Sequence, residues 1–268
     1  MTWLWIPAGV FLTLLWLIYS PAHRAKKTSW FRGHFAHRGL FALDQTIPEN
    51  SHAAFQAAID QGIGIELDVQ ASADLDLFVF HDDGLNRMCG VDGILEETIA
   101  QDLGALRLAK TSEQIPLFED VLKQVNGQVP LLVEIKTTTR RIETVTAVLD
   151  ALKTYEGPYA ICSFDPLILL QLKALNPYIL RGLNMEATLK KKRFDLKTRL
   201  VLEYGLMNFL IRPDYLSIDY THRNLTYRLH RLMGGFGMMW ALPSAEAEQS
   251  IARDCETVIF EGYLPTHL

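Results

Sequence analysis

The stretch Gly64-Ile65-Glu66-Leu67-Asp68-Val69-Gln70 has the alternation of a β-strand that carries two carboxylates on one face. Side chains of a strand alternate between faces, so Glu66 and Asp68 project together. Leu67 and Val69 then project the other way, toward covering helices. Two buried carboxylates repel each other, and a divalent cation is their simplest partner because Mg²⁺ and Ca²⁺ prefer oxygen ligands. The alternative is an amphipathic strand whose acids face water.

The composition is typical of one mildly acidic globular domain. The 268 residues are 49% hydrophobic and carry a formal net charge of −5. That length suffices for a single α/β barrel, and nucleic-acid-binding proteins usually show a basic excess instead. The three scattered cysteines indicate neither a disulfide framework nor a metal cluster. We therefore expect no nucleic-acid partner, and the sequence predicts no protein partner.

The N-terminal segment is predicted to be a membrane anchor. Residues 2–22 carry no charge, and the run from Trp3 to Tyr19 is almost wholly apolar. A helix of that length reaches roughly 26 Å, close to the hydrocarbon thickness of a bilayer. A signal peptide would need a basic start, and the first basic residue here is Arg24. We expect a transmembrane helix over residues 1–22 and a juxtamembrane linker over residues 23–32.

The first charges after the apolar segment are all basic. They are Arg24, Lys26, Lys27 and Arg32. Basic residues accumulate on the cytoplasmic side of membrane-spanning helices. The sequence therefore predicts a single-pass membrane protein whose globular part, residues 33–268, lies on the cytoplasmic side.

Short apolar runs alternate with helical patterns through the rest of the chain. The expected strands are His34–Arg38, Gly64–Gln70, Leu131–Lys136, Tyr159–Ser163, Ile179–Leu183, Tyr215–Asp219, Gly237–Ala241 and Thr257–Glu261. The expected helices are Asn50–Gln61, Leu117–Val125, Arg140–Thr154, Pro166–Leu175, Lys197–Asn208, Thr226–Met233 and Ala245–Asp254. Alternation predicts a parallel α/β sheet, and eight strands predict a closed (β/α)₈ barrel.

One run, Leu77–His81, breaks this alternation. It follows the second strand after only about six turn-like residues, whereas a parallel return needs a dozen or more. We therefore expect a short extra strand in an antiparallel hairpin. With the turn centred near residues 73 and 74, His81 lies about opposite Glu66. A slip of one residue in this register would turn His81 away from the carboxylates.

Further candidate residues lie at the ends of the expected strands. His37 ends the first strand and precedes a glycine, a place where barrel enzymes hold catalytic side chains, although a lone histidine is more often a hydrogen-bonded core residue. Glu134 and Lys136 share one face of a later strand. Glu134 would complete an oxygen triad with the first two acids; the alternative is a structural ion pair between Glu134 and Lys136.

Taken together, these residues resemble the glycerophosphodiester phosphodiesterase family, within the superfamily of phospholipase C-like phosphodiesterase barrels. The matching runs are Ala36-His37-Arg38-Gly39, Pro48-Glu49-Asn50-Ser51, Ala54-Phe55, Glu66-Leu67-Asp68-Val69-Gln70, His81-Asp82, Glu134-Ile135-Lys136 and Ser163-Phe164-Asp165, with Trp240 near the end. The resemblance covers about residues 34–265. Departures from the family's pattern are Ser51 for Thr, Trp240-Ala241-Leu242 for Trp-Thr-Val, and Phe260-Glu261-Gly262 for the usual Thr-Asp.

The resemblance implies a metal-dependent barrel that hydrolyses glycerophosphodiesters to glycerol 3-phosphate and an alcohol. It implies one divalent cation, Mg²⁺, Ca²⁺ or Mn²⁺, with the ligands Glu66, Asp68 and Glu134. It implies His37 and His81 as general acid and base, in either order. Phosphate and substrate contacts would come from Arg38, Lys136, Glu49 and Trp240, with Glu49 orienting either Arg38 or a glycerol hydroxyl.

The implied division of labour agrees with elementary chemistry. A phosphodiester is anionic and repels nucleophiles, so a cation and basic side chains must neutralise its charge. Two imidazoles that titrate near neutrality suit paired proton transfers. The attacking hydroxyl is water or the neighbouring glycerol hydroxyl, and the sequence does not decide between them.

Two other functions fit the same residues. A lysophospholipase D acting on membrane lysophospholipids would make use of an anchor that holds the barrel close to lipid. A catalytically inactive, membrane-tethered barrel is the other. The presence of both histidines and all three acids argues against this inactive barrel.

Overall fold

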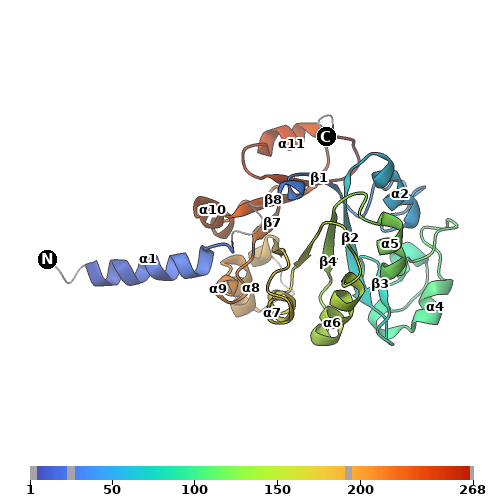
Figure 1. Cartoon of the computed structure of the whole chain (residues 1–268), viewed down its shortest axis with the longest axis horizontal. Helices are drawn as coiled ribbons and strands as arrows, with labels where there is room; N and C mark the ends of the chain where they lie inside the picture. The colour runs from blue at the N-terminus through green and yellow to red at the C-terminus, as the bar shows by residue number, and fades with distance from the viewer. Residues whose placement is uncertain (1–4, 23–27, 191–194, 266–268) are drawn as a thin grey trace.

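The computed structural model describes residues 5–22, 28–190 and 195–265, which include a barrel of eight parallel strands (Figure 1). The strands are β1 (Gly33–Ala36), β2 (Gly64–Ala71), β4 (Leu131–Ile135), β5 (Tyr159–Ser163), β6 (Arg181–Met185), β7 (Tyr215–Asp219), β8 (Phe236–Leu242) and β9 (Thr257–Phe260). Strand β1 pairs with both β9 and β2, which closes the barrel. The predicted α/β barrel is confirmed.

Helices cover the outside of the barrel. They are α2 (His52–Asp60), α5 (Phe118–Val125), α6 (Arg141–Leu152), α7 (Pro166–Leu175), α8 (Leu196–Glu203), α9 (Asn208–Ile211), α10 (Leu225–Leu232) and α11 (Ala245–Ile251). The single helix expected over Lys197–Asn208 is divided into α8 and α9. Gly205 lies between them at φ +57°, a left-handed conformation that glycine adopts readily and that ends a helix.

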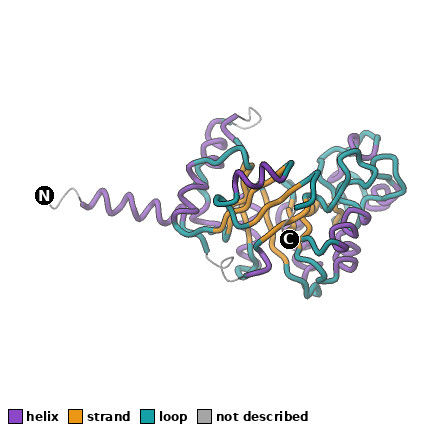
Figure 2. The backbone as a smooth tube through the Cα atoms, turned by 90° about the horizontal axis from the view of Figure 1, so that it is seen from above, coloured by secondary structure: helices purple, strands orange, loops and turns teal. Residues whose placement is uncertain are grey.

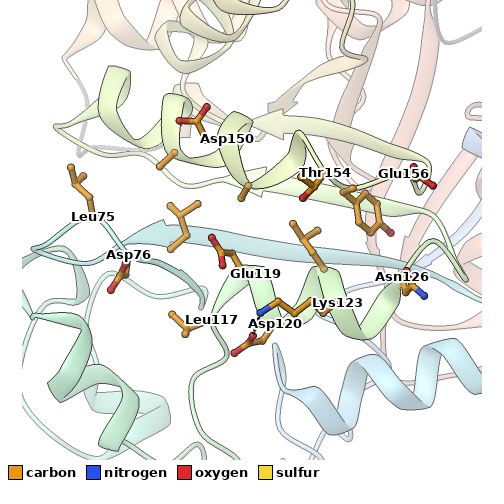
Figure 3. A pocket seen from close by; sticks show the side chains of 15 residues that line it. Leu75, Asp76, Leu117, Glu119, Asp120, Lys123, Asn126, Asp150, Thr154 and Glu156 are labelled. Carbon is orange, nitrogen blue, oxygen red and sulfur yellow. Dashed lines mark hydrogen bonds and ion pairs between the residues drawn. The ribbon is translucent and has the colours of Figure 1, made fainter.

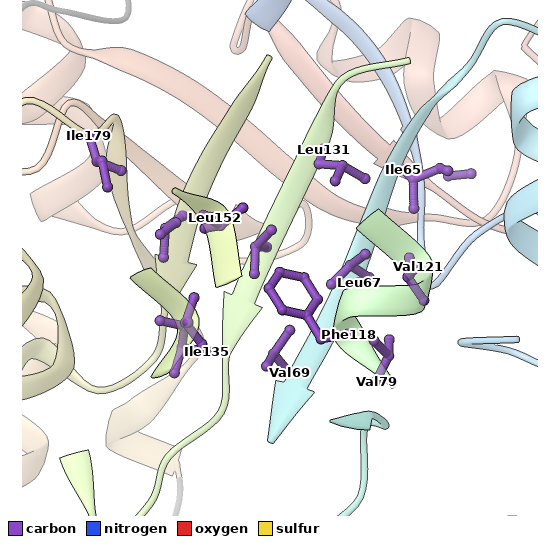
Figure 4. Packing of buried hydrophobic residues seen from close by; sticks show 14 of the residues in the cluster. Ile65, Leu67, Val69, Val79, Phe118, Val121, Leu131, Ile135, Leu152 and Ile179 are labelled. Carbon is purple, nitrogen blue, oxygen red and sulfur yellow. The ribbon is translucent and has the colours of Figure 1, made fainter. Parts of the chain in front are cut away.

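The alternation along β2 divides its side chains between the core and the barrel interior. Leu67 and Val69 lie in the main hydrophobic cluster with Phe118 of α5 (Figure 4). Glu66 and Asp68 line a cavity inside the barrel instead. Burial of each apolar side chain stabilises the fold by about 1.5–3 kcal/mol, so the strand cannot slip by one residue without losing this contribution. The predicted faces of this strand are confirmed.

A second apolar cluster closes the end of the barrel at which the strands begin. Phe31 belongs to the short helix η3 (Ser29–Phe31) that precedes β1. Its ring centroid lies 4.6 Å from that of Tyr215 and 5.2 Å from that of Phe236. These residues begin β7 and β8, so the aromatic plug leaves the opposite end of the barrel for polar side chains. In α/β barrels that end carries the active site.

The predicted hairpin is present, with a register one residue away from the predicted one. Strand β3 (Leu77–Val79) is antiparallel to β2, and Val69 pairs with Val79. Extended further, this register would place His81 opposite Leu67 and turn it toward the helices. Because β3 ends at Val79, the strand alternation stops first, and His81 lines the cavity that also holds Glu66.

The segment between β3 and α5 packs around an apolar cluster of its own. It contains α3 (Asn86–Cys89), η4 (Leu95–Glu97) and α4 (Ala100–Ala105). Met88, Leu95 and Leu103 are buried in this cluster. The segment lies beside β3 at one flank of the barrel (Figure 1), where it brings Arg87 close to the barrel mouth.

Helix α1 (Trp5–Tyr19) extends away from the barrel as a rod (Figures 1 and 2). At its base Tyr19 Oη donates a hydrogen bond to the carbonyl oxygen of Tyr204, at 3.2 Å. The helix has 15 residues, and in the described part of the chain no helix is both long and apolar enough to cross a membrane. The predicted transmembrane anchor is therefore not supported. Residues 1–4 and 23–27 lie outside the described residues.

Candidate active site

A cavity of about 830 Å³ lies at the carboxyl-terminal ends of the barrel strands. It contains eight of the nine predicted site residues: His37, Arg38, Glu66, Asp68, His81, Glu134, Lys136 and Trp240. The ninth, Glu49, contacts Arg38 through a hydrogen bond of 2.7 Å. Parallel strands bring these residues together because their carboxyl ends meet at the same rim of the barrel.

Three buried carboxylates form a cluster in this cavity. Glu66 and Asp68 come from β2, and Glu134 comes from β4, where it pairs in register with Asp68. One oxygen of each lies within 4.8 Å of the others. Burial, with the charges of Asp68 and Glu134, holds the pKa of Glu66 well above its usual range. Without a cation, one of these carboxyl groups therefore stays protonated.

The cluster fits a hard divalent cation. Its three carboxylate oxygens are the ligand type that Mg²⁺, Ca²⁺ and Mn²⁺ prefer, and their mutual repulsion disappears when a cation lies between them. Among the residues that the structure describes, no other group of histidine, cysteine or carboxylate side chains has this geometry. The donor set therefore fits the predicted cation without distinguishing between these three ions.

Two basic side chains lie beside the acids. Lys136 Nζ is 2.8 Å from Glu134 Oε1 and 3.3 Å from Asp68 Oδ1. Arg38 Nε is 3.6 Å from Asp68 Oδ2. Although burial raises the pKa of Asp68, the charges of Lys136, His81 and Arg38 bring it below the usual range. The expected structural ion pair between Glu134 and Lys136 is thus present, and it forms part of the cavity wall.

Each of the two histidines contacts a carboxylate through Nδ1. His37 Nδ1 lies 2.6 Å from Glu261 Oε2, and His81 Nδ1 lies 2.7 Å from Asp82 Oδ1. A carboxylate at Nδ1 orients the ring and assigns proton exchange to Nε2. Burial lowers the pKa of His81, and the charges of Lys136 and Arg38 act in the same direction.

Arg87 links the two sides of the site through charged hydrogen bonds. Its guanidinium contacts Asp82 at 2.5 Å and Glu49 at 2.6 Å. Glu49 in turn accepts a hydrogen bond from Arg38 Nη1. Of the two roles expected for Glu49, orienting Arg38 is the one that this contact supports.

Three buried polar atoms in the cavity have no hydrogen-bond partner among the described residues. They are Arg38 Nε, Asn184 Oδ1 and Trp240 Nε1. An unsatisfied buried polar group costs about 1–3 kcal/mol, so such atoms are uncommon in a folded protein. Two donors and one acceptor in a single cavity indicate that a polar ligand belongs there.

A model of the glycerophosphoryl diester phosphodiesterase family matches residues 37–227, which include both histidines and all three acids. The chain belongs to this family. The match covers most of the barrel, from the end of β1 into α10.

Curated relatives agree with this assignment. YqiK from Bacillus subtilis, which has no assigned function, is 33% identical over 159 residues, covering 55% of this chain and 64% of that protein. A glycerophosphodiester phosphodiesterase from Bacillus altitudinis is 34% identical over 109 residues, covering 38% of this chain and 43% of that protein. The chain thus spans less than two thirds of the length of either relative.

Solved structures share the fold. A phosphodiesterase from Oleispira antarctica, in complex with its product sn-glycerol-3-phosphate, superposes with a TM-score of 0.71 at 23% identity, covering 87% of this chain and 94% of that chain. A glycerophosphodiester phosphodiesterase from Thermotoga maritima has a TM-score of 0.65 at 24% identity, covering 85% of this chain and 93% of that chain. At these identities the likeness concerns the barrel fold alone.

Two asparagines hold the acids of this family site, and neither was predicted to have a role. Asn50 Nδ2 donates to Asp68 Oδ2 at 2.9 Å, and Asn184 Nδ2 donates to Glu134 Oε2 at 2.8 Å. Each amide fixes one carboxylate, as partners of metal ligands commonly do. Asn184 was missed because the strand expected to end at Leu183 continues to Met185.

Glu261 is the second residue that sequence reasoning missed. The sequence shows it only as part of a departure from the family's Thr-Asp pattern. In the structure it directly follows β9 and contacts His37. Its position one residue beyond an expected strand end, on the strand that neighbours β1, is the signal that could have suggested this contact.

A cavity of similar size, about 840 Å³, lies outside the barrel between α5 and α6 (Figure 3). It is lined by several charged side chains, including Asp120, Lys123 and Asp150. Lys123 and Asp120 form an exposed ion pair at 2.9 Å. Its described lining contains neither a histidine nor a buried carboxylate cluster, so the family's chemistry belongs to the cavity at the barrel mouth.

Proposed function

We propose that this protein is a glycerophosphodiester phosphodiesterase, a metal-dependent hydrolase that releases glycerol 3-phosphate and an alcohol. The observation that carries the proposal is the assembly of three carboxylates, two carboxylate-bound histidines and two basic side chains in one cavity. Membership of the family and the named relative from Bacillus altitudinis support it.

Arg38 and Lys136 bind the phosphodiester by charge. The diester anion repels an incoming hydroxyl, and positive charge beside it lowers the energy of the more highly charged transition state. Arg38 Nε has no hydrogen-bond acceptor among the described residues, so it donates to a phosphate oxygen when substrate is present. A divalent cation held by Glu66, Asp68 and Glu134 would neutralise further phosphate charge.

His37 and His81 carry the two proton transfers. His81 accepts the proton of the attacking hydroxyl at Nε2, because its lowered pKa keeps the ring neutral near pH 7. His37 donates a proton from Nε2 to the oxygen of the leaving alcohol as the phosphorus–oxygen bond breaks. Glu261 and Asp82 hold the two rings at Nδ1. The attacking hydroxyl is that of water or of the neighbouring glycerol carbon.

The test is the removal of either imidazole. His37→Ala and His81→Ala should each lower kcat on glycerophosphocholine by about 10²–10⁴-fold, because each variant lacks one general acid or base. Their melting temperatures should stay within a few degrees of the parent, since both side chains line a solvent-filled cavity. Near-normal turnover by a folded variant at either position would refute the roles given to the histidines.

For the location of the barrel, residues 33–268, we propose the cytoplasmic side of a membrane. The basic residues Arg24, Lys26, Lys27 and Arg32 after the apolar N-terminal segment support this orientation. A reporter fused after Leu268 should therefore be active when it requires the cytoplasm. Strong activity of a reporter that requires export would contradict the orientation.

A further inference from the structure

A second cavity, of about 500 Å³, adjoins the active-site cavity. The two cavities share the lining residues Thr137, Phe164, Asn184 and Glu186. One of these, Asn184, also holds the carboxylate of Glu134. The two cavities are therefore neighbouring parts of one cleft, and the border between them passes next to the acid cluster.

The second cavity has a wall of hydrocarbon side chains, which we call the apolar groove. It is formed by Leu167 of α7, Met185 of β6, Val201 and Leu202 of α8, and Met207 before α9. Leu167 remains 41% exposed although it is hydrophobic. Two methionines give such a wall the ability to adjust to an irregular apolar ligand.

The charged residues of the apolar groove do not make it an ionic site. Arg141 Nε and Asp165 Oδ2 form an ion pair at 2.6 Å, so each neutralises the other. Asp195 and Lys197 are exposed to solvent at the start of α8. A charged or hydroxyl-rich group inside the groove would lose water hydrogen bonds against Val201, Leu202 and Met207 without replacing them.

The cleft as a whole thus has an ionic half and an apolar half. We propose that the apolar groove binds a hydrocarbon chain carried by the phosphodiester, so that the preferred substrate is a diester with one such chain. This inference rests on the proposed hydrolysis of phosphodiesters at the adjoining site. The chain is attached either to the glycerol, as in a lysophospholipid, or to the leaving alcohol.

A chain-length series tests the substrate class. Two sets of diesters, lysophosphatidylcholines and glycerophospho-n-alkanols, are assayed below their critical micelle concentrations against glycerophosphocholine. For one of the sets, kcat/KM should rise about tenfold for every three methylenes and then level off, since a buried methylene favours binding. The set that shows the rise tells which arm of the diester carries the chain. Equal kcat/KM across both sets, with glycerophosphocholine hydrolysed, would overturn the inference alone.

Binding of dodecylphosphocholine, below its critical micelle concentration, separates this inference from the proposed activity. Titration calorimetry should detect 1:1 binding that is at least tenfold weaker in Val201→Glu. If no diester is hydrolysed but this binding pattern is found, the proposed activity fails and the groove stands. If the probe does not bind, or binds Val201→Glu equally well, the groove is refuted.

Matched variants on α8 locate the effect. Val201→Glu places a carboxylate in the groove and should lower kcat/KM for the long-chain substrate at least tenfold while glycerophosphocholine stays within twofold. Leu200→Glu is the control, because Leu200 is 38% exposed on the same helix and does not line the groove. It should leave both substrates within twofold. Equal losses on both substrates in folded Val201→Glu would contradict the assignment.

Discussion

Glu66 is a carboxyl group that its surroundings hold neutral. Burial and two neighbouring acids raise its pKa, whereas Lys136 lies against the other two members of the cluster. A cation binds the ionised form, so its binding must release the proton from this cluster. The cation therefore regulates charge at the site as well as neutralising the substrate.

This linkage predicts that the affinity for Mg²⁺ or Ca²⁺ rises with pH until the pH exceeds the raised pKa. Titration calorimetry in two buffers with different ionisation enthalpies should report proton release, up to one per ion. Glu66→Gln should bind the cation more weakly and release no proton from this position. Proton uptake on binding, or an affinity independent of pH between about 5.5 and 8, would contradict this account of the cluster.

Glu261 acts on the chemistry through His37. Its carboxylate holds Nδ1 of that imidazole at 2.6 Å. We predict that Glu261→Gln lowers kcat about 10–100-fold with little change in KM, because the amide neither orients nor charges the ring in the same way. Glu261→Asp should recover part of the rate. A rate for Glu261→Gln equal to that of the parent would show that His37 needs no such partner.

At the scale of single residues, the sequence is most informative where a motif is local. The pairs Glu66 with Asp68 and Glu134 with Lys136 follow from strand alternation, and their shared cavity bears out that geometry. Asn184 and Glu261 come from distant strands and belong to no local pattern. Their contacts depend on the three-dimensional neighbours of β6 and β9, which no spacing along the chain reveals.

Among elements, the strands were easier to place than their ends. Tyr159–Ser163 and Tyr215–Asp219 occur with the predicted bounds, because each is a buried apolar run with a polar end. Strand β6 is displaced by two residues, and the hairpin register differs by one. Such displacements arise because hydrogen bonding to neighbouring strands, and not the apolar run alone, decides where a strand stops.

Helix α1 shows the same limit from another direction. Its apolar composition predicts a helix, and one is present. The length of the run predicted a membrane span, but the described helix is 15 residues long and no described helix meets the requirements of a span. Composition thus predicts the kind of element better than its extent, because extent depends on the structure at each end.

For the whole molecule, the alternation of strands and helices predicted the closed barrel because few folds accommodate eight parallel strands. Closure through β1 places His37 and Arg38 next to β2, and therefore next to the acids. The aromatic plug at the opposite end directs all of this chemistry to one mouth. The apolar groove beside that mouth was not predicted, because its wall combines residues from α7, β6 and α8.

The most direct test of the central claim is phosphorus NMR of glycerophosphocholine incubated with the purified protein and Mg²⁺ or Ca²⁺. The account predicts conversion to glycerol 3-phosphate, loss of that conversion on chelation with EDTA, and its return when the cation is restored. Release of phosphocholine instead of glycerol 3-phosphate, undiminished conversion in EDTA, or no conversion with either cation or with Mn²⁺ would contradict it.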